Sequence, residues 1–188
     1  MEFKAVRGVE DLIPPESEKF EKVVEIFKDV VKKAGFRKVI LPIFEEAGLF
    51  SRSVGETTDI VQKEMYVFED KGGRIIALRP EGTASAVRAY IEHGVYAKEP
   101  FTKWFYVGPM FRFERPQAGR KRQFFQAGCE VFGLSSPGAD AEVIRVAVDI
   151  LDSLKVDCSL EINSIGCEKC RPEYRKALIE FLEQRKEE

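Results

Sequence analysis

The chain has 188 residues, a length that supports one domain with a substantial hydrophobic core. Its 30 lysines and arginines almost balance its 32 acidic residues, and the net charge of −2 argues against a histone-like or tail-like nucleic-acid binder without excluding a local basic patch. Four cysteines are too few for a disulfide scaffold, and no apolar run approaches the ~18 residues that cross a bilayer. Because the start also lacks an apolar signal segment, we expect a cytoplasmic protein without membrane contact.

The first part of the chain combines helical and strand patterns. Apolar residues at helical spacing predict an amphipathic helix over residues 16–34, and Gly35 is suited to end it. Residues 36–41 are typical of a strand that stops before Pro42. A short helix is expected over residues 47–54.

A hairpin and a further helix follow. The apolar stretches 65–68 and 74–78 are joined by the sequence DKGG at 70–73, which is typical of a tight turn between two strands. Residues 81–93 again have helical spacing.

Two long strands rich in aromatic residues are predicted at 102–113 and 122–134. The segment between them is polar and contains proline and glycine, which indicates a wide hairpin loop. Trp104, Phe105 and Tyr106 are expected to be core residues of the first of these strands.

The last part of the chain is mostly helical. Pro137 stands near the start of a helix to about Leu154, whose apolar residues cover more than one face and predict extensive burial. Residues 160–163 resemble a strand, and a final helix begins at about Pro172. Hairpins segregated from helices, without regular alternation of the two, predict an α+β fold with an antiparallel sheet.

The densest charge lies in the predicted hairpin. Between positions 112 and 122 one acid, Glu114, stands among five cations and leaves a net charge of +4; the cations are Arg112, Arg115, Arg120, Lys121 and Arg122. Guanidinium groups match phosphate oxygens, so this segment suggests a polyanion site. Phe124 and Phe125 should point to opposite faces of a strand, so that one ring can line a site for a nucleobase. A solvated basic loop with core aromatics is an equally open alternative.

Cys167 and Cys170 form a single C-x-x-C pair. Zinc takes four ligands, and neither the other cysteines nor His93 has the spacing of a second pair. Structural or incidental thiols are the favoured interpretation, with metal or redox use as the alternative. No structural metal is expected.

The segment 110–133, MFRFERPQAGRKRQFFQAGCEVFG, resembles motif 2 of class II aminoacyl-tRNA synthetases and, in detail, the histidyl-tRNA synthetase version. Other segments are similar to that family in the same order: 8–12 (GVEDL), 35–50 with Pro42, 78–83 (LRPEGT) and 163–166 (NSIG). The resemblance therefore covers essentially the whole chain. It departs at Phe113 and Phe125, where histidine is common, and at Lys121, where an aromatic residue is common.

The resemblance implies a fold and a reaction. The fold would be a class II catalytic domain, an antiparallel sheet flanked by helices, with motif 1 at about 16–50 and motif 2 at about 101–134. Family members join histidine to ATP with release of pyrophosphate and then transfer histidine to the 3′ end of tRNA. Mg²⁺ accompanies ATP, and the family forms homodimers. No segment resembles motif 3 or the anticodon-binding domain, so residues 1–188 are expected to be a catalytic domain incomplete at its C-terminal side.

The resemblance also implies an ATP site. Arg112 matches the catalytic arginine that grips the α-phosphate and the amino-acid carboxylate. Four further residues match positions that contact ATP: Glu114, Arg120, Arg122 and Phe124. The ring of Phe124 would stack on adenine.

A histidine site is implied as well. Glu81, Thr83 and Gln126 match positions that hold the substrate ammonium, and Glu130 matches the carboxylate that recognises the imidazole. Gln126, Gly128 and Glu130 share one strand face because they are two residues apart, and the glycine makes room between the polar residues. Ordinary surface salt bridges are the alternative for these residues.

Two other functions remain open. The regulatory subunit of ATP phosphoribosyltransferase resembles the same family but does not charge tRNA, and a truncated module could bind ATP or a partner without catalysis. Glu81, Arg112, Gln126 and Glu130 together favour the ligase, because a regulator has no need to keep an ATP-gripping set.

Overall fold

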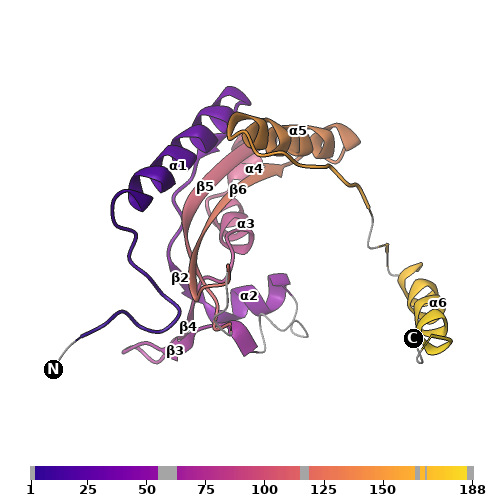
Figure 1. Cartoon of the computed structure of the whole chain (residues 1–188), viewed down its shortest axis with the longest axis horizontal. Coiled ribbons are helices and arrows are strands. Elements are labelled where there is room, and N and C mark those ends of the chain that lie inside the picture. Colours follow the sequence, from indigo (N-terminus) through magenta and orange to yellow (C-terminus); the bar gives the residue numbers. More distant parts are fainter. Residues whose placement is uncertain (1–2, 55–62, 115–118, 164–165, 168, 186–188) are drawn as a thin grey trace. The chain divides into compact units, whose positions relative to one another are not determined.

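The computed structural model describes residues 3–54, 63–114, 119–163, 166–167 and 169–185. It contains two compact units, residues 1–156 (unit 1) and 157–188 (unit 2), each of which is described by itself (Figure 1). All residues assigned above to the ATP and histidine sites belong to unit 1.

The larger sheet of unit 1 contains three strands in the order β1-β5-β6. β5 (Thr102–Phe111) and β6 (Gln123–Phe132) form the predicted long antiparallel hairpin, in which Tyr106 lies opposite Gly128. β1 (Arg37–Lys38) pairs in parallel with β5, so the sheet is antiparallel apart from this short pair. Because side chains alternate along each strand, the two faces of the hairpin pack against different helices.

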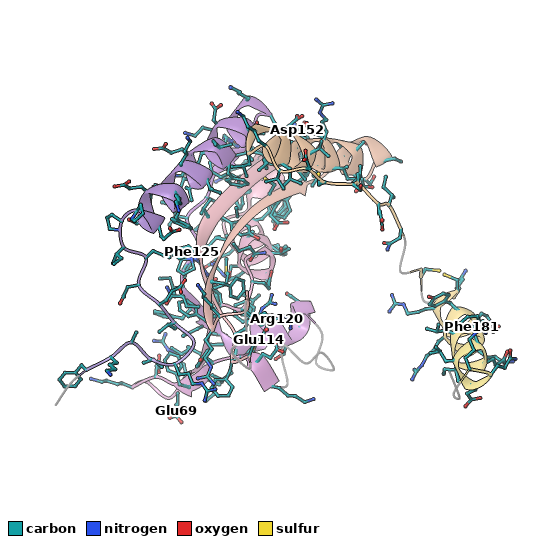
Figure 2. The ribbon with its side chains drawn as sticks, viewed as in Figure 1. Glu69, Glu114, Arg120, Phe125, Asp152 and Phe181 are labelled. Carbon is teal, nitrogen blue, oxygen red and sulfur yellow. The ribbon has the colours of Figure 1, made fainter. Side chains whose placement is uncertain are left out.

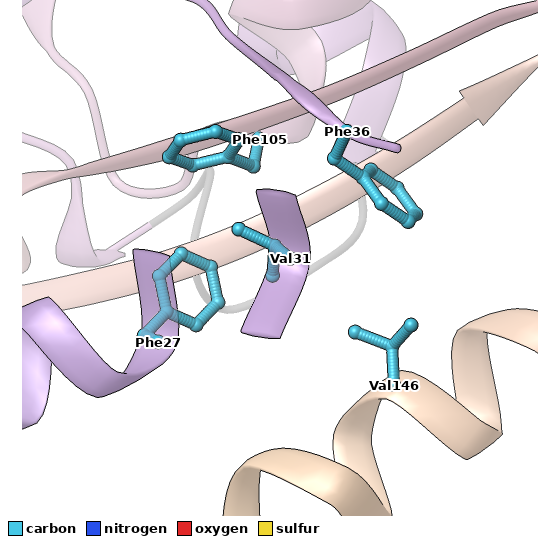
Figure 3. Close-up of a cluster of buried hydrophobic side chains, with 5 residues drawn as sticks. All are labelled: Phe27, Val31, Phe36, Phe105 and Val146. Carbon is cyan, nitrogen blue, oxygen red and sulfur yellow. The ribbon is translucent and has the colours of Figure 1, made fainter. Parts of the chain in front are cut away.

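Two helices cover one face of this sheet (Figure 1): α1 (Glu16–Lys33) and α5 (Pro137–Ser153). α1 ends as the sequence predicts, because Gly35 adopts a φ of +84° that few other residues tolerate. The buried side chains shared by these elements form one core cluster (Figure 3): Phe27, Val31, Phe36, Phe105 and Val146.

The opposite face of the hairpin packs against α3 (Thr83–Glu92). Alanines of α3 contact Tyr106 and Met110 of β5, both of which are buried. Phe124 of β6 joins the same cluster, so the even-numbered residues of β6 point to the α3 face. The candidate site residues of β6 therefore lie between the sheet and α3.

A second, smaller sheet contains β2 (Phe44–Glu46), β4 (Ile75–Leu78) and β3 (Val67–Glu69), with both strand pairs antiparallel. β3 and β4 are the predicted hairpin, and the Asp70 carboxylate accepts a hydrogen bond from the Arg74 backbone N–H at 3.0 Å in its turn. The sequence analysis did not predict β2.

The described residues form three further α-helices. α2 (Ala47–Val54) forms as predicted and buries Phe50. α4 (Val95–Lys98) was not predicted. In unit 2, α6 (Arg171–Glu183) forms close to its predicted position. None of the described helices combines the length and apolar character needed to cross a membrane.

The structure contradicts two predictions made for the last part of the chain. Residues 160–163 form no strand; they are exposed and pair with no other strand in the described part of the chain, which leaves a short apolar run without a sheet to join. The predicted burial of the helix beginning at Pro137 is also overstated, because in α5 only Ala139 and Val146 are buried.

The predicted strand over residues 36–41 is too long, since only β1 forms there. A buried arginine, Arg79, which is 5% exposed, contacts the chain that follows β1. Its Nη1 donates hydrogen bonds to the carbonyl oxygens of Leu41 and Pro42, both at 3.0 Å. Its Nε donates to the carbonyl oxygen of Pro109 at 2.9 Å. Arg79 therefore satisfies backbone acceptors that no neighbouring strand reaches, and it ties the chain after β1 to β5.

Replacing Arg79 with methionine is expected to lower the free energy of unfolding of unit 1 by about 3 kcal/mol, because the buried Leu41 carbonyl and the partly buried Pro42 and Pro109 carbonyls lose their donor. Urea denaturation followed by the fluorescence of Trp104, the single tryptophan, measures this change. Arg145→Met is the matched control, since Arg145 is exposed on α5 and should change the value by less than about 0.5 kcal/mol. Equal effects of the two variants would contradict the role given to Arg79.

Candidate functional site

A pocket of about 590 Å³ lies at the loop end of the β5–β6 hairpin. Its lining residues are Glu64, Arg112, Glu114, Gly119, Arg120, Lys121, Phe124 and Phe125. Three cations and the Phe124 ring give the pocket the charge and the flat apolar surface that phosphates joined to a planar base require. Four of the residues predicted to contact ATP therefore come together here, whereas Arg115 lies outside the described residues.

Arg112 is held at the inner side of this pocket. Its Nε donates a hydrogen bond to the carbonyl oxygen of Pro80 at 2.9 Å, and its guanidinium carbon lies 5.2 Å from the centre of the Phe124 ring. The backbone carbonyl and the ring fix the plane of the guanidinium group. Because Nε makes the bond to Pro80, the two terminal nitrogens keep donors for an anionic ligand.

Glu114 lies between two guanidinium groups of the pocket. Its Oε2 is 3.4 Å from Nη1 of Arg120, and its Oε1 is 4.0 Å from Nη1 of Arg112. The Glu114 side chain is 17% exposed, whereas that of Arg120 is 65% exposed. Figure 2 shows Glu114 and Arg120 next to each other.

The adjacent aromatic residues of β6 point to opposite faces, as predicted. Phe124 faces Arg112 and the α3 side of the sheet, while the Phe125 ring lies 4.6 Å from the ring of Phe20 in α1. Phe125 is thus supported from the other side of the hairpin. The departure from the family pattern at this position does not alter the face that carries Phe124.

The structure does not bring Arg122 into the lining of this pocket. Its backbone N–H donates to the Gly8 carbonyl oxygen at 2.7 Å, and its guanidinium carbon lies 4.0 Å from the centre of the Phe113 ring. Gly8 permits this close approach, because a Cβ there would lie 2.8 Å from the Arg122 side chain. Arg122 therefore anchors the N-terminal segment against the hairpin.

Glu81 caps the first turn of α3. Its Oε2 accepts a hydrogen bond from the Thr83 backbone N–H at 2.5 Å, and its Oε1 accepts one from the Ala84 N–H at 2.9 Å. A carboxylate is favoured here because the helix N-terminus carries unpaired donors and a positive partial charge. A second pocket, of about 370 Å³, is lined by Ser53, Glu81, Thr83, Ala84 and Val87.

Glu130 is the centre of a hydrogen-bonded group on the α3 face of β6. Its Oε1 accepts hydrogen bonds from the Thr83 hydroxyl at 2.8 Å and from the Tyr106 hydroxyl at 3.3 Å. Burial raises the pKa of Glu130, and the negative charge of Glu81 acts in the same direction, while the two hydrogen bonds oppose the rise. The predicted histidine-site residues Glu81, Thr83 and Glu130 are thus adjacent in space.

Tyr106 is a member of this group that the sequence analysis assigned only to the core. It is buried, and its ring lies between two glycines: a Cβ at Gly82 or at Gly128 would come within 2.3 Å of ring atoms. Gly128 therefore makes room for Tyr106, not for an open space between Gln126 and Glu130. The local sequence carries no signal for this contact: the burial of the tyrosine hydroxyl, which needs a partner, and its position opposite Gly128 are set by the strand register.

Gln126 has a buried side-chain oxygen that lacks a hydrogen-bond partner among the described residues. Buried polar atoms are nearly always paired, so such an atom calls for an explanation. It lies on the same strand face as Glu130, two positions along. An unpaired acceptor at this place suits a site whose ligand supplies an N–H donor.

Comparison with known proteins decides the family. The family model described as histidyl-tRNA synthetase matches residues 8–185. The chain belongs to this family. A histidine–tRNA ligase from Aquifex aeolicus is 54% identical to it over 189 aligned residues, which cover 100% of the chain and 47% of that protein.

Solved structures agree on the fold. The apo histidyl-tRNA synthetase of S. aureus matches with a TM-score of 0.75 and 36% identity, over 97% of this chain and 43% of that one. An ATP phosphoribosyltransferase regulatory subunit/histidyl-tRNA synthetase from Bacillus halodurans matches with a TM-score of 0.71, and its 21% identity shows the fold alone. The α+β fold predicted from the family resemblance is confirmed, and the chain spans less than half the length of the Aquifex ligase and of both solved chains.

The described residues contain no group of three or more histidine, cysteine, aspartate or glutamate side chains that could hold a metal ion. The four cysteines are free thiols: Cys129, Cys158, Cys167 and Cys170. The sulfur atoms of Cys167 and Cys170 lie 3.6 Å apart in unit 2.

Replacing Tyr106 with phenylalanine is expected to raise the pKa of Glu130 further, because one of the two donors to its carboxylate is lost while the ring stays between the glycines. The titration of Glu130, followed by NMR of its side-chain carboxyl carbon, should have a higher midpoint than in the wild-type chain. Tyr96→Phe is the control, since Tyr96 is exposed on α4. An unchanged midpoint in Tyr106→Phe would show that the 3.3 Å contact carries no hydrogen bond.

Proposed function

We propose that this chain forms the part of a histidine–tRNA ligase that binds ATP and histidine side by side. The observation that carries the proposal is the position of Arg112. Its guanidinium group faces the cationic pocket beside Phe124, and its Nε is hydrogen-bonded to Pro80, the residue immediately before Glu81. One arginine thus links the pocket proposed for ATP to the turn proposed for histidine.

ATP would occupy the pocket of about 590 Å³. Its adenine ring would stack on Phe124, and its α-phosphate would bind the terminal nitrogens of Arg112. Glu114 lies within ion-pair distance of both Arg112 and Arg120, and a phosphate would replace it as the anionic partner of one or both of them. Arg122, which matches an ATP-contacting position in the family, would act mainly by anchoring residues 7 and 8 next to the pocket.

Histidine would bind next to the N-terminus of α3. Glu81 and Thr83 present oxygen acceptors for the ammonium group, and the unpaired oxygen of Gln126 offers a third. A carboxylate that accepts two hydrogen bonds keeps further lone pairs, so Glu130 can also accept the imidazole N–H. Burial strengthens the interactions of Gln126 and Glu130 by lowering the local dielectric constant around them.

The chemistry requires alignment and charge stabilisation, not a covalent enzyme intermediate. A carboxylate oxygen of histidine attacks the α-phosphorus, the bond to the β-phosphate oxygen breaks, and pyrophosphate leaves with the bonding electrons. Arg112 would neutralise the charge that grows on the α-phosphate oxygens during this step. A terminal hydroxyl of the tRNA 3′ end then attacks the carbonyl carbon of the adenylate, and AMP leaves.

Magnesium, the homodimer and a cytoplasmic location are part of this proposal. Mg²⁺ would arrive with ATP, bound to its phosphate oxygens. The tRNA acceptor end would approach the loop side of the hairpin, where the cations lie.

The boundaries proposed for motifs 1 and 2, at about 16–50 and 101–134, enclose α1, β1 and the hairpin.

The proposal is tested by calorimetric titration of the 188-residue chain with ATP, and then with histidine in the presence of ATP. We expect ATP to bind and histidine to bind more tightly than glutamine, which lacks an imidazole. Histidine-dependent exchange between ATP and pyrophosphate measures whether the chain is active by itself. Binding of histidine with no detectable binding of ATP would favour the non-catalytic regulatory function over the ligase.

A further inference from the structure

Cys167 and Cys170 lie at the start of α6 in unit 2, where Cys170 directly precedes the first helical residue. Their sulfur atoms are 3.6 Å apart, and both residues are exposed. The backbone N–H of Arg171 donates to the Cys167 carbonyl oxygen at 2.9 Å, which closes one turn of chain around the pair. The two sulfurs need to approach by only about 1.5 Å to reach the length of a disulfide bond.

Backbone N–H groups donate hydrogen bonds to both sulfur atoms. The N–H of Cys167 donates to Sγ of Cys170 at 3.0 Å. Hydrogen bonds from the backbone N–H groups of Cys170 and Lys169 lower the pKa of the Cys167 thiol. The positive end of the α6 dipole favours a thiolate in the same place. Because the thiolate is the nucleophile, Cys167 is the more reactive member of the pair.

The backbone before the pair is shaped around the second sulfur. Gly166 has a φ of +72°, and a Cβ at this position would lie 2.8 Å from Sγ of Cys170. The absence of a side chain leaves the space that this sulfur occupies beside Cys167. The two thiols are therefore held together by the geometry of the turn.

We propose that Cys167 and Cys170 form a redox-active dithiol that a small-molecule disulfide oxidises to an intramolecular disulfide. None of the residues assigned to ATP or histidine takes part, so this proposal does not depend on the proposed function. The alternative, a metal half-site, would need ligands beyond the pair, because zinc takes four, and the test below distinguishes it from the dithiol.

The exchange has two steps. The Cys167 thiolate attacks one sulfur of the small disulfide, forms a mixed disulfide and releases the other half as a thiolate. The Cys170 thiolate then attacks the Cys167 sulfur, forms the internal bond and releases the second half. The protein loses two thiol protons and two electrons, and the small disulfide gains them as two thiols.

The other two cysteines provide internal references. Burial raises the pKa of Cys129 to about 11, so its thiolate is scarce at neutral pH. Cys158 is exposed in the same unit but stands outside the turn that holds the pair. Exposure therefore does not distinguish Cys167 and Cys170 from Cys158, whereas the short distance between their sulfur atoms does.

The test treats the 188-residue chain with oxidised glutathione, quenches the reaction with acid, unfolds the protein and alkylates every remaining thiol for mass spectrometry. We expect the wild-type chain to lose two of its four alkylatable thiols without carrying a glutathione adduct. Peptide mapping should assign the new bond to Cys167 and Cys170. Four alkylated thiols under conditions that oxidise a free dithiol reagent would overturn the proposal, as would a bond that includes Cys158.

Two variants separate the steps. Cys170→Ser should stop at the mixed disulfide and retain one glutathione on Cys167, whereas the control Cys158→Ser should still lose two thiols. Circular dichroism checks that α6 is intact, and the wild-type result decides the question if either variant fails to fold. If Zn²⁺ alone protects the wild-type pair from alkylation while oxidised glutathione leaves it reduced, the pair binds metal and the redox proposal is wrong.

Discussion

Replacing Arg112 with alanine is expected to weaken ATP binding to this chain by about 10- to 100-fold, the effect of losing charge-assisted hydrogen bonds to a phosphate. The loss should be large because a backbone carbonyl and an aromatic ring both hold Arg112 in place beside the pocket. Calorimetric titration with ATP at fixed salt measures the dissociation constants of variant and wild type.

Arg145→Ala is the matched control for this measurement, since it removes an exposed arginine from α5 and leaves the pocket unchanged. Arg122→Ala adds a second comparison: its guanidinium group packs on Phe113 outside the pocket lining, so we expect a smaller effect than for Arg112. If Arg112→Ala binds ATP within about twofold of the wild type, Arg112 is not the phosphate ligand.

Replacing Glu130 with glutamine is expected to weaken histidine binding by about tenfold and leave ATP binding within about twofold, because hydrogen bonds to a charged group are roughly twice as strong as neutral ones. The substitution is conservative in this site. The amide oxygen can still accept from the hydroxyl groups of Thr83 and Tyr106, which now bind Oε1. Parallel titrations with histidine and ATP separate the two effects, and Glu69→Gln on β3 is the control. Equal loss of both ligands would indicate a structural role for Glu130.

Although Glu130→Gln is expected to weaken histidine binding, it should increase the stability of the folded chain. Since the pKa of Glu130 is raised in the folded chain, its protonated form is favoured there, and the associated stability is present at low pH and lost as pH rises through the folded pKa. Glu130→Gln should therefore unfold at a higher temperature than the wild type at pH 7, and the difference should shrink below the ordinary glutamate value of 4.5. A lower melting temperature at pH 7 would show that the ionised carboxylate stabilises the fold.

Much of the fold was predictable because its elements have strong local signals. The helical spacing of Phe27 and Val31 and the glycine at position 35 define α1 and its end. The aromatic strands on either side of a polar loop define the β5–β6 hairpin. The short strand β2 was missed because its three residues, Phe44–Glu46, are too few to show the alternation of apolar and polar side chains that marks a strand. They form a strand because they pair with β4.

The candidate site was predictable for residues that share a strand or a motif. Gln126 and Glu130 lie on one face of β6 as their spacing requires, and Phe124 and Phe125 point to opposite faces. Tyr106 was taken for a core residue because nothing in the local sequence shows which group lies opposite its hydroxyl. Pairing across the strands and the two glycines beside the ring decide that contact.

The sequence by itself determined the family, through ordered motifs, and most helices and strands, through periodicity and turn residues. Tertiary structure alone decided how the cations are divided: Arg112 and Arg120 line the pocket, while Arg122 holds the N-terminal segment. It also decided that Arg79 is buried against three carbonyl groups. The physical reason is that the charge and the hydrogen-bond donors of an arginine are properties of the residue type and can be read from the sequence. Its partners depend on which distant backbone and side-chain groups the fold brings within reach.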